Sequence, residues 1–260
     1  MTPEKTAIRA FHRRLHTWYA AHGRRTLPWR NTSDPYAIYL SEIMLQQTQV
    51  KTVLAHYYFP FLKQFPTLAS LAKTKQADVL KLWQGLGYYN RAIHLHEAAR
   101  KCNGTLPATP EALMALPGIG RNTANAVAAF AFRAPVPVME ANVRRVLSRM
   151  FALKHPDEKT LWQKAELLLD TRNPFDYNQA MMDIGAQVCT GRSPQCTSCP
   201  ANALCKGKSS PQAFPEKKRK KAVPVREKTI VVRKNRRAQY FAAPRAGKFL
   251  RGLYAFCDTP

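Results

Sequence analysis

Four cysteines lie close enough in the sequence to bind one metal centre. They follow the spacing C-x6-C-x2-C-x5-C and are Cys189, Cys196, Cys199 and Cys205. Thiolates gathered this closely either pair as disulfides or hold a metal, and a chain of 260 residues with 45% hydrophobic content does not need disulfides to fold. Structural zinc sites usually combine two close pairs of ligands, whereas this loop has one C-x-x-C pair and two single cysteines. The spacing therefore favours an iron-sulfur cluster, with zinc or disulfides as the alternatives.

A turn with two glycines could bind an anion. Residues 116–121, LPGIGR, separate two helical stretches. Gly118 and Gly120 permit positive φ angles and the close approach of a bulky partner. The free N–H groups that open the second helix favour an anion, and a DNA phosphate would fit. The alternative is a plain helix-helix corner with a glycine cap.

The elements that would position these groups are helical. Residues 1–205 have helical patterning nearly throughout and little strand-like alternation. Asp34-Pro35 predicts an N-cap followed by proline at the first helical position, opening a helix that reaches about Leu45. Thr109-Pro110 predicts a helix that reaches about Leu116, and an alanine-rich helix follows the turn at residues 124–132. We expect a mainly α fold that contains a helix, a tight hairpin and a second helix.

The charge of the chain indicates a polyanionic partner. The net charge is +25 and the isoelectric point is near 10.2, so nucleic acid is the first candidate. Residues 206–260 hold sixteen Lys and Arg against three acidic residues, which leaves residues 1–205 basic as well. With no apolar run of membrane-spanning length and no secretory signal, we expect a soluble intracellular protein, cytoplasmic or associated with the nucleoid, that does not contact membranes.

The order of these motifs resembles that of a known superfamily. LPGIGR, followed by PVMEANVRRVLSR and then by the cysteine loop, is similar to the helix-hairpin-helix DNA glycosylases that carry a four-iron four-sulfur (4Fe-4S) cluster. Four further segments resemble the adenine DNA glycosylase branch, MutY, in particular. They are LPWR at 27–30, DPYAIYLSEIMLQQTQV at 34–50, GLGYYNRA at 85–92 and NQAMMDIGAQVC at 178–189. The resemblance covers roughly residues 5–206.

This resemblance implies a two-lobed helical fold with one 4Fe-4S cluster held by the four cysteines. It also implies a monomer that acts on double-stranded DNA in base excision repair and removes adenine mispaired with 8-oxoguanine or guanine. Gly118, Gly120 and Arg121 would then contact DNA.

Excision of adenine needs one acid and one anion, and two glutamates meet this need. The acid protonates the departing base, while the anion stabilises an oxocarbenium-like sugar. Glu42 lies within an apolar helix, where burial favours its protonated form. Glu140 precedes a helix that begins near Asn142, and the positive end of the helix dipole favours an ionised carboxylate there. Alternatively, each glutamate is a structural cap or a partner of Arg144 or Arg145.

Two positions depart from the family pattern. Glu140-Ala141 stands where the family has an aspartate followed by glycine, and the added methylene can shift a catalytic oxygen by about 1 Å, which can cost roughly 100-fold in rate. Asn122 stands where bifunctional relatives have a lysine that attacks the sugar, and the adenine branch usually has serine or tyrosine. Because asparagine cannot form a Schiff base, we expect monofunctional excision, with Asn122 at the catalytic site.

The resemblance also assigns residues to DNA and to the base. Gln47 and Tyr88 would enter the duplex near the lesion, and Trp29, Arg30 and Gln179 would line the base pocket. Three of these assignments have an alternative: Tyr88 could be a surface aromatic residue, Trp29 a core side chain and Gln179 an amide on a helix surface.

Beyond the cysteines we expect two further segments. Residues 1–206 form the glycosylase domain with its cluster loop at 189–205, residues 207–227 form a basic linker that is either a spacer or a phosphate contact, and residues 228–260 are a truncated or vestigial Nudix-like segment. In this last segment, residues 228–232 and 238–242 could pair as a β-hairpin.

Three hypotheses of function remain open. The first is a monofunctional adenine glycosylase. The second is a glycosylase of the same scaffold that removes thymine glycol or mismatched thymine. The third is an iron-sulfur protein that binds DNA without catalysis.

Overall fold

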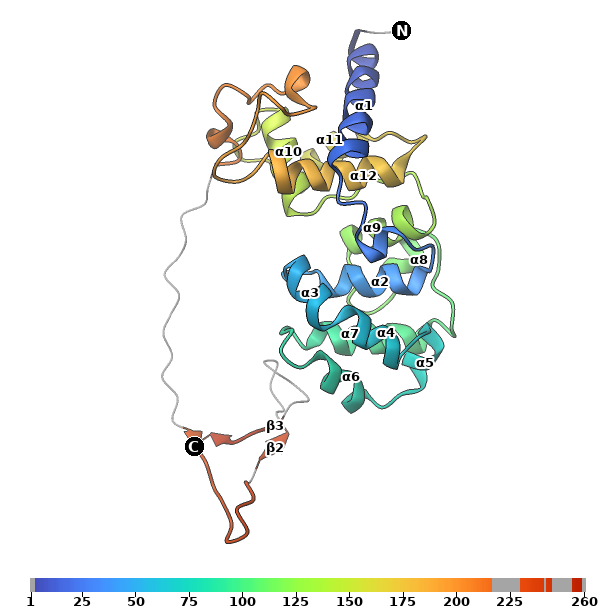
Figure 1. Ribbon diagram of the computed structural model, residues 1–260, viewed down its shortest axis with the longest axis vertical. Coiled ribbons are helices and arrows are strands. Elements are labelled where there is room, and N and C mark those ends of the chain that lie inside the picture. The colour runs from blue at the N-terminus through green and yellow to red at the C-terminus, as the bar shows by residue number, and fades with distance from the viewer. Residues whose placement is uncertain (1–2, 217–229, 241, 245–253, 259–260) are drawn as a thin grey trace.

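The computed structural model describes residues 3–216, 230–240, 242–244 and 254–258. Its long helices form two lobes stacked along the length of the molecule (Figure 1), and the mainly α prediction is confirmed. In chain order the α-helices are α1 (Pro3–His22), α2 (Pro35–Met44), α3 (Val50–His56), α4 (Tyr58–Gln64), α5 (Leu68–Lys73), α6 (Gln76–Trp83), α7 (Asn90–Lys101), α8 (Pro110–Met114), α9 (Arg121–Ala131), α10 (Ala141–Met150), α11 (Glu158–Leu168) and α12 (Pro174–Asp183). The shorter helical turns are η1 (Pro28–Arg30), η2 (Ile184–Val188), η3 (Asn202–Leu204) and η4 (Pro211–Ala213).

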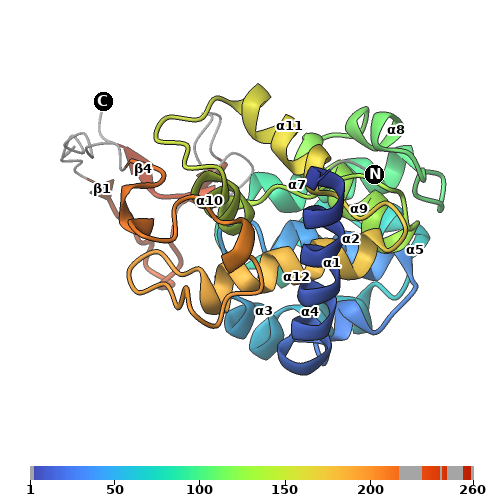
Figure 2. The same cartoon turned by 90° about the horizontal axis from the view of Figure 1, so that it is seen from above.

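Each lobe has its own hydrophobic core. Helices α2 to α9 share one buried cluster, which includes Tyr39, Phe61 and Trp83. Helices α1 and α10 to α12 share a second one, which includes Phe11 and Leu147. Helix α1 crosses α12 in the second lobe, as Figure 2 shows from above. The chain therefore begins in the second lobe, forms the whole first lobe and then returns. A third buried cluster, which includes Ile38 of α2, Phe130 of α9 and Phe175 of α12, packs the two lobes against each other.

Helix α2 is formed as the sequence predicts. The carboxylate of Asp34 accepts a hydrogen bond from the N–H of Tyr36 at 2.9 Å, and Pro35 occupies the first turn. Nearly every side chain of the helix is buried, so it forms a central part of the first lobe. Burial of one large apolar side chain contributes about 1.5–3 kcal/mol. A helix held on all sides in this way can carry a charged residue to a fixed place at the lobe boundary.

The α8–α9 hairpin needs glycine at its first position. Thr109 caps α8 through the N–H of Ala112, as predicted. Gly118 has φ +73°, and a Cβ added there would lie 2.6 Å from the Cβ of His94. Both the backbone conformation and the close approach of α7 therefore exclude a side chain at Gly118. Beyond the turn, the alanine-rich α9 packs against α2.

Helix α12 ends in one π-helical turn, η2, that leads directly into Cys189. At this turn a Cβ on Gly185 would lie 2.6 Å from the Cβ of Asn142. The glycine thus allows the first turn of α10 to pack directly on η2. Wider turns of this kind are frequent at functional sites.

The residues after 229 form short strands. These are β1 (Ile230–Val231), β2 (Ala243–Pro244), β3 (Tyr254–Ala255) and β4 (Cys257–Asp258). A turn begins at Asn235, between the two segments that were predicted to pair as a hairpin. An antiparallel bridge joins Lys234 to Tyr240 across this turn. The strand partners differ from the prediction: β1 pairs with β4 and β2 with β3. Part of the predicted hairpin, and most of the predicted linker, lie outside the described residues.

Throughout the described ranges, no helix combines the length and the apolar character needed to cross a membrane.

Candidate active site and cysteine pocket

Two glutamates from different lobes lie near one another. Glu42 is on α2 and Glu140 caps α10. Burial raises the pKa of Glu42 to about 7; the positive charge of Arg30 opposes this shift and the negative charge of Glu140 adds to it. Glu42 as a residue keeps some exposed surface, but its carboxyl group is largely removed from water. The three charged groups therefore interact in one region at the lobe boundary.

Glu140 is held by the helix that it caps. Its Oε2 accepts hydrogen bonds from the backbone N–H and the side-chain amide of Asn142 at 2.9 and 3.2 Å, and its Oε1 accepts one from the N–H of Val143 at 3.2 Å. Backbone donors at a helix N-terminus suit an anionic carboxylate. Neither arginine considered from the sequence makes a recorded ion pair with it, since Arg144 pairs with Glu158 and Arg145 donates to Asn142. Capping and catalysis are thus compatible for Glu140.

Asn122 contacts the segment just before Glu140. Its Oδ1 accepts a hydrogen bond from the N–H of Met139 at 2.7 Å. The side chain joins the first turn of α9 to the segment that enters α10. In the structure Asn122 is therefore placed to position Glu140.

The three residues assigned to the base pocket are all buried. Trp29 packs edge-on against the ring of Tyr58 with 5.2 Å between ring centroids, which gives it the surroundings of a core side chain. Gln179 on α12 is 3% exposed, so it is not an amide on the helix surface. Arg30 is buried as well, and among the described residues its Nε has no hydrogen-bond partner.

Arg30 is fixed by Asp183, a residue for which the sequence analysis gave no role. Two hydrogen bonds of 2.7 and 3.0 Å join the Arg30 guanidinium to the Asp183 carboxylate, and Arg24 donates to the same carboxylate from its backbone and side chain at 2.8 Å. Although burial alone would raise the pKa of Asp183, the hydrogen bonds and charges of Arg30 and Arg24 bring it below its ordinary value. In the sequence, Asp183 could have been noticed as an acidic residue within the otherwise apolar C-terminal end of α12.

Gln47 and Tyr88 both lie in turns and point outward. Their φ angles are +57° and +50°, and the Tyr88 side chain is 60% exposed. Residues other than glycine rarely adopt such angles. The structure thus presents both side chains to solvent from strained backbone.

The residues assigned to the hairpin have different surroundings. Gly118 and Gly120 flank the turn, and Gly120 has open space around its Cα. Arg121 does not extend freely, because its guanidinium lies 3.9 Å from the ring centroid of Trp162 and 3.0 Å from Glu166. Arg121 therefore connects the hairpin to α11.

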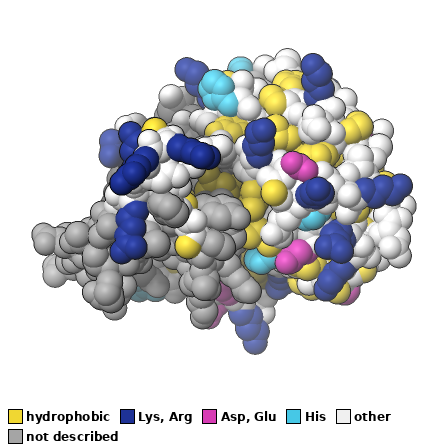
Figure 3. Space-filling view, turned by 90° about the horizontal axis from the view of Figure 1, so that it is seen from below, with side chains coloured by type: hydrophobic (Ala, Val, Ile, Leu, Met, Phe, Trp, Pro, Cys, Tyr) yellow, Lys and Arg dark blue, Asp and Glu magenta, His cyan; other side chains and the backbone are white. Residues whose placement is uncertain are grey.

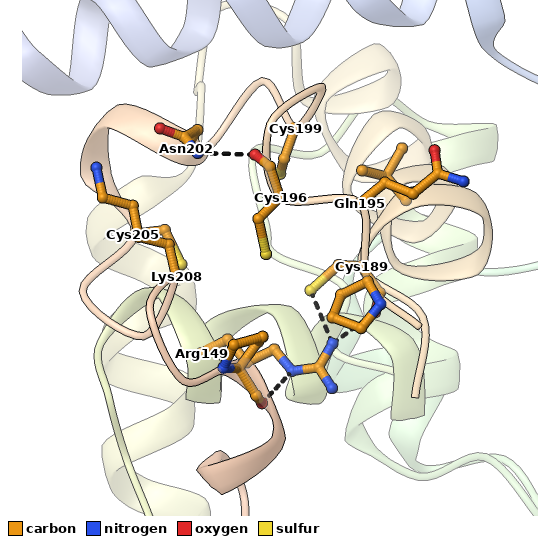
Figure 4. A pocket seen from close by; sticks show the side chains of 11 residues that line it. Arg149, Cys189, Gln195, Cys196, Cys199, Asn202, Cys205 and Lys208 are labelled. Atoms are coloured by element: carbon orange, nitrogen blue, oxygen red, sulfur yellow. Dashed lines mark hydrogen bonds between the residues drawn. The ribbon is translucent and has the colours of Figure 1, made fainter. Parts of the chain in front are cut away.

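The four cysteines line one pocket. Arg149, Gln195, Asn202 and Lys208 line the same pocket (Figure 4). All four are free thiols, which excludes the disulfide alternative. Within the described part of the chain, no three His, Cys, Asp or Glu side chains lie close enough together to hold a single metal ion.

The chemistry of this pocket suits a cationic group. Burial, together with the other cysteines, raises the pKa of Cys199 to about 11, so its thiolate is disfavoured unless a positive charge is present. Arg149 donates to the Sγ of Cys189 at 3.3 Å and to five backbone carbonyls of the loop or of the segment that follows it. Asn202 donates to the carbonyl of Cys196 at 2.7 Å. The pocket therefore offers four free thiols, which is the donor set that a metal centre with thiolate ligands requires.

Lys and Arg side chains are scattered over the described part of the face seen from below, with fewer Asp and Glu among them, and hydrophobic side chains lie in a hollow (Figure 3). Such a surface suits a polyanion.

Known proteins resemble this chain over most of its length. Residues 40–170 match the family described as HhH-GPD superfamily base excision DNA repair protein. The chain is 39% identical to the adenine DNA glycosylase of Buchnera aphidicola subsp. Baizongia pistaciae over 75% of this chain and 58% of the relative. For the human adenine DNA glycosylase these figures are 42%, 77% and 40%. The chain thus spans about half the length of these relatives.

Other relatives carry different names. A thymine-DNA glycosylase of Aeropyrum pernix is 35% identical over 78% of this chain and 96% of the relative. Among solved structures, a thermostable thymine-DNA glycosylase has a TM-score of 0.73 and 30% identity, and covers 80% of this chain and 99% of its own. A non-covalent endonuclease III–DNA complex shares the fold, with a TM-score of 0.66 at 21% identity over 80% of this chain and 98% of that one.

Proposed function

The chain belongs to the HhH-GPD superfamily of base excision DNA repair proteins, and we propose that it is a monofunctional glycosylase that hydrolyses the N-glycosidic bond of adenine mispaired with 8-oxoguanine or guanine. The names of the bacterial and human relatives support adenine as the base. The observation that carries the proposal is the placement of Glu42 and Glu140, one with a pKa of about 7 and the other at a helix N-terminus, in a single region with Arg30.

In the proposed reaction Glu42 acts as the general acid and Glu140 as the stabilising anion. Glu42, protonated near neutral pH, donates its proton to a ring nitrogen of the purine as the bond from the sugar C1′ breaks, and the bonding electron pair leaves with the base. The Glu140 carboxylate stabilises the positive charge that develops on the sugar. Water then adds to C1′ and releases a proton. Asn122 takes no covalent part, because an amide is not a nucleophile, so the strand stays intact until alkali cleaves it.

We propose the substrate to be double-stranded DNA bound by a monomer inside the cell. Gln47 and Tyr88 would occupy the space left by the extruded base, since both extend from the surface. Gly118 and Gly120 would allow a phosphate to approach the start of α9. Arg30 and Gln179 would offer the base buried polar groups, and Arg30 has the Nε without a hydrogen-bond partner among the described residues. Trp29 would form an apolar wall of this base pocket, and Arg121 would support the hairpin.

The four cysteines would hold one 4Fe-4S cluster. The spacing of the cysteines, and the pocket that they share, support such a cluster over a single zinc ion. When bound, such a cluster supplies fixed thiolate bonds that order the loop and a centre that can exchange an electron. We also propose residues 1–206 as the glycosylase domain, 207–227 as a basic linker and 228–260 as a separate segment.

A second function has its own support. The match to the Aeropyrum pernix thymine-DNA glycosylase covers 96% of that relative. The solved structure of a thermostable thymine-DNA glycosylase also has a higher TM-score, 0.73, than the endonuclease III complex, 0.66. Removal of mismatched thymine is therefore the second candidate.

One assay separates these functions. End-labelled duplexes with A:8-oxoguanine, A:guanine, T:guanine or thymine glycol are incubated with the protein, and strand breaks are scored with and without alkali. Breaks at adenine only after alkali support the proposal. Breaks at thymine or at thymine glycol overturn it in favour of the pyrimidine enzyme, and retarded duplexes without base loss overturn it in favour of a non-catalytic binding protein.

A further inference from the structure

One arginine contacts both turns that present Gln47 and Tyr88. Arg91 lies in the first turn of α7. Its Nη1 donates to the carbonyls of Ile43, Met44 and Gln46 at 2.9, 3.0 and 2.5 Å, all in or just after α2. Its Nη2 donates to Thr48 Oγ1 at 3.3 Å and to the carbonyls of Leu86 and Gly87 at 3.3 and 3.2 Å. A single planar group therefore joins the end of α2 to the turn before α7.

The carbonyls at the end of α2 need such a donor. The last carbonyls of a helix have no partner inside the helix, and a cation there also offsets the negative end of the dipole. Glu42 directly precedes the first of the carbonyls that Arg91 binds. The position of Glu42 along α2 is thus linked to the Arg91 guanidinium.

Each turn holds one residue other than glycine in an unfavourable backbone conformation. Gln47 and Tyr88 have positive φ angles, and Gly85 and Gly87 in the second turn have φ +91° and +78°. A residue other than glycine in this conformation costs on the order of 1 kcal/mol and stays there only when its surroundings fix it. Arg91 binds the carbonyls on the N-terminal side of both strained residues.

Aromatic rings fix the guanidinium itself. The Arg91 Cζ lies 5.6 Å from the ring centroid of Trp83 and 5.3 Å from that of Tyr88. Trp83 also donates to the carbonyl of Gly87 at 3.1 Å. The exposed Tyr88 ring is therefore held on its inner side by the same arginine that binds the Gln47 turn.

We propose that Arg91 is the positioning residue that fixes the Gln47 turn and the Tyr88 turn at one mutual distance, so that both side chains enter damaged duplex DNA as a unit. This inference rests on the proposed function of the chain as a DNA glycosylase. Lysine does not replace this arginine, because an ammonium group cannot reach two opposite rows of acceptors in one plane.

The test uses Arg91→Lys and the stronger Arg91→Met in the full chain. Arg100→Lys and Arg100→Met are the matched controls, because Arg100 is exposed on the same helix. Binding is measured on a duplex with a stable abasic-site analogue and on the same duplex undamaged. We expect both Arg91 variants to lose about tenfold or more in affinity for the abasic duplex while affinity for the undamaged duplex changes less than twofold. An equal loss on both duplexes overturns the proposal.

A double-mutant cycle separates positioning from a general structural role. Tyr88→Ala and Gln47→Ala are each combined with Arg91→Lys, whose fold is checked by thermal unfolding. If Arg91 acts through these side chains, it has little further effect once they are removed. Fully additive losses in abasic-duplex affinity overturn the proposal. Because no base is excised in this assay, its outcome is independent of whether adenine release, the proposed function, is found.

Discussion

At the scale of single residues, the environment of each carboxyl group decides its role. Glu42 and Glu140 have the same side chain, but one lies in a desolvated place between helices and the other accepts backbone hydrogen bonds at a helix start. A buried carboxyl group and a carboxylate held by backbone N–H groups can serve as acid and anion.

Replacement of Glu42 by Gln should remove the proton donor and keep the shape of the side chain. We expect the rate of adenine release to fall by about 100- to 10,000-fold, the usual contribution of general acid catalysis. Affinity for an uncleavable mispaired duplex should change little. Single-turnover rates and duplex affinity measured on one preparation check this, and an unchanged rate would contradict the role of Glu42.

The pKa of Glu42 also predicts the pH dependence of the rate. Because it is raised from 4.5 to about 7, the acid is protonated below pH 7 and ionises above it. The single-turnover rate should therefore be level on the acid side and fall about tenfold per pH unit above pH 7. The pH profile of Glu42→Gln shows whether Glu42 or another group causes this fall in rate. The residual rate of the variant should not decrease above pH 7.

Glu140→Gln should lower the rate with a smaller effect on the fold. Loss of the negative charge removes stabilisation of the positive sugar, and we expect a fall of about 100- to 1,000-fold, as for other preorganised electrostatic groups. The weaker cap of α10 should cost about 1 kcal/mol in the free energy of unfolding. Denaturant unfolding alongside kinetics measures both, with Glu140→Asp as the variant that keeps charge and cap. A rate unaffected by Glu140→Gln would remove Glu140 from the mechanism.

At the scale of elements, short turns decide where the functional side chains lie. The hairpin between α8 and α9 uses positive φ at Gly118, and the end of α2 uses the guanidinium of Arg91. The sequence predicted the glycine turn, whereas the contacts of Arg91 could not be predicted, because they involve segments that meet only in the folded chain.

Gly118→Ala should destabilise the chain and Gly120→Ala should not. Alanine at Gly118 meets both the positive φ angle and the side chain of His94 at 2.6 Å, for which we expect a loss of about 1–3 kcal/mol. Gly120 has φ −89° and no heavy atom within 4 Å of an added Cβ, so its replacement should change the stability by less than about 0.5 kcal/mol. Equal losses in denaturant unfolding would show that the turn is not built in this way.

At the scale of the whole molecule, the cysteine pocket is connected to the region of the two glutamates. Arg145 donates to the carbonyl of Cys189 at 2.8 Å and to Asn142 Oδ1 at 2.7 Å, and Asn142 donates to Glu140. The loop at the outer end of the second lobe thereby contacts the start of α10, where Glu140 lies.

Loss of one cysteine ligand should therefore affect more than the loop. For Cys199→Ser we expect loss of bound iron and sulfide, a lower melting temperature and weaker binding to duplex DNA. Metal analysis, visible absorption and duplex affinity measure this, with Cys102→Ser as the control outside the pocket. Zinc in place of iron in the purified wild type would overturn the cluster assignment and leave the structural role of the pocket intact.

Much of the fold could be read from local signals. Asp34-Pro35 and Thr109-Pro110 predicted where α2 and α8 begin, because capping involves only neighbouring residues. The helix after LPGIGR was also predicted, but α9 begins at Arg121, three residues before the predicted start. The short strands after residue 229 were predicted with other partners, because strand pairing depends on distant segments.

The sequence by itself determined the helical class, the family, the spacing of the cysteines and the candidacy of Glu42 and Glu140, since these follow from residue types at fixed separations. Only the tertiary structure decided that Asp183 fixes Arg30, that Asn122 contacts the segment before Glu140, that Arg121 packs on Trp162 and that Arg91 joins two turns. The physical reason is that a buried polar group must find partners across the fold. Asp183 lies 153 residues from Arg30 in the sequence, and Met139 lies 17 residues from Asn122.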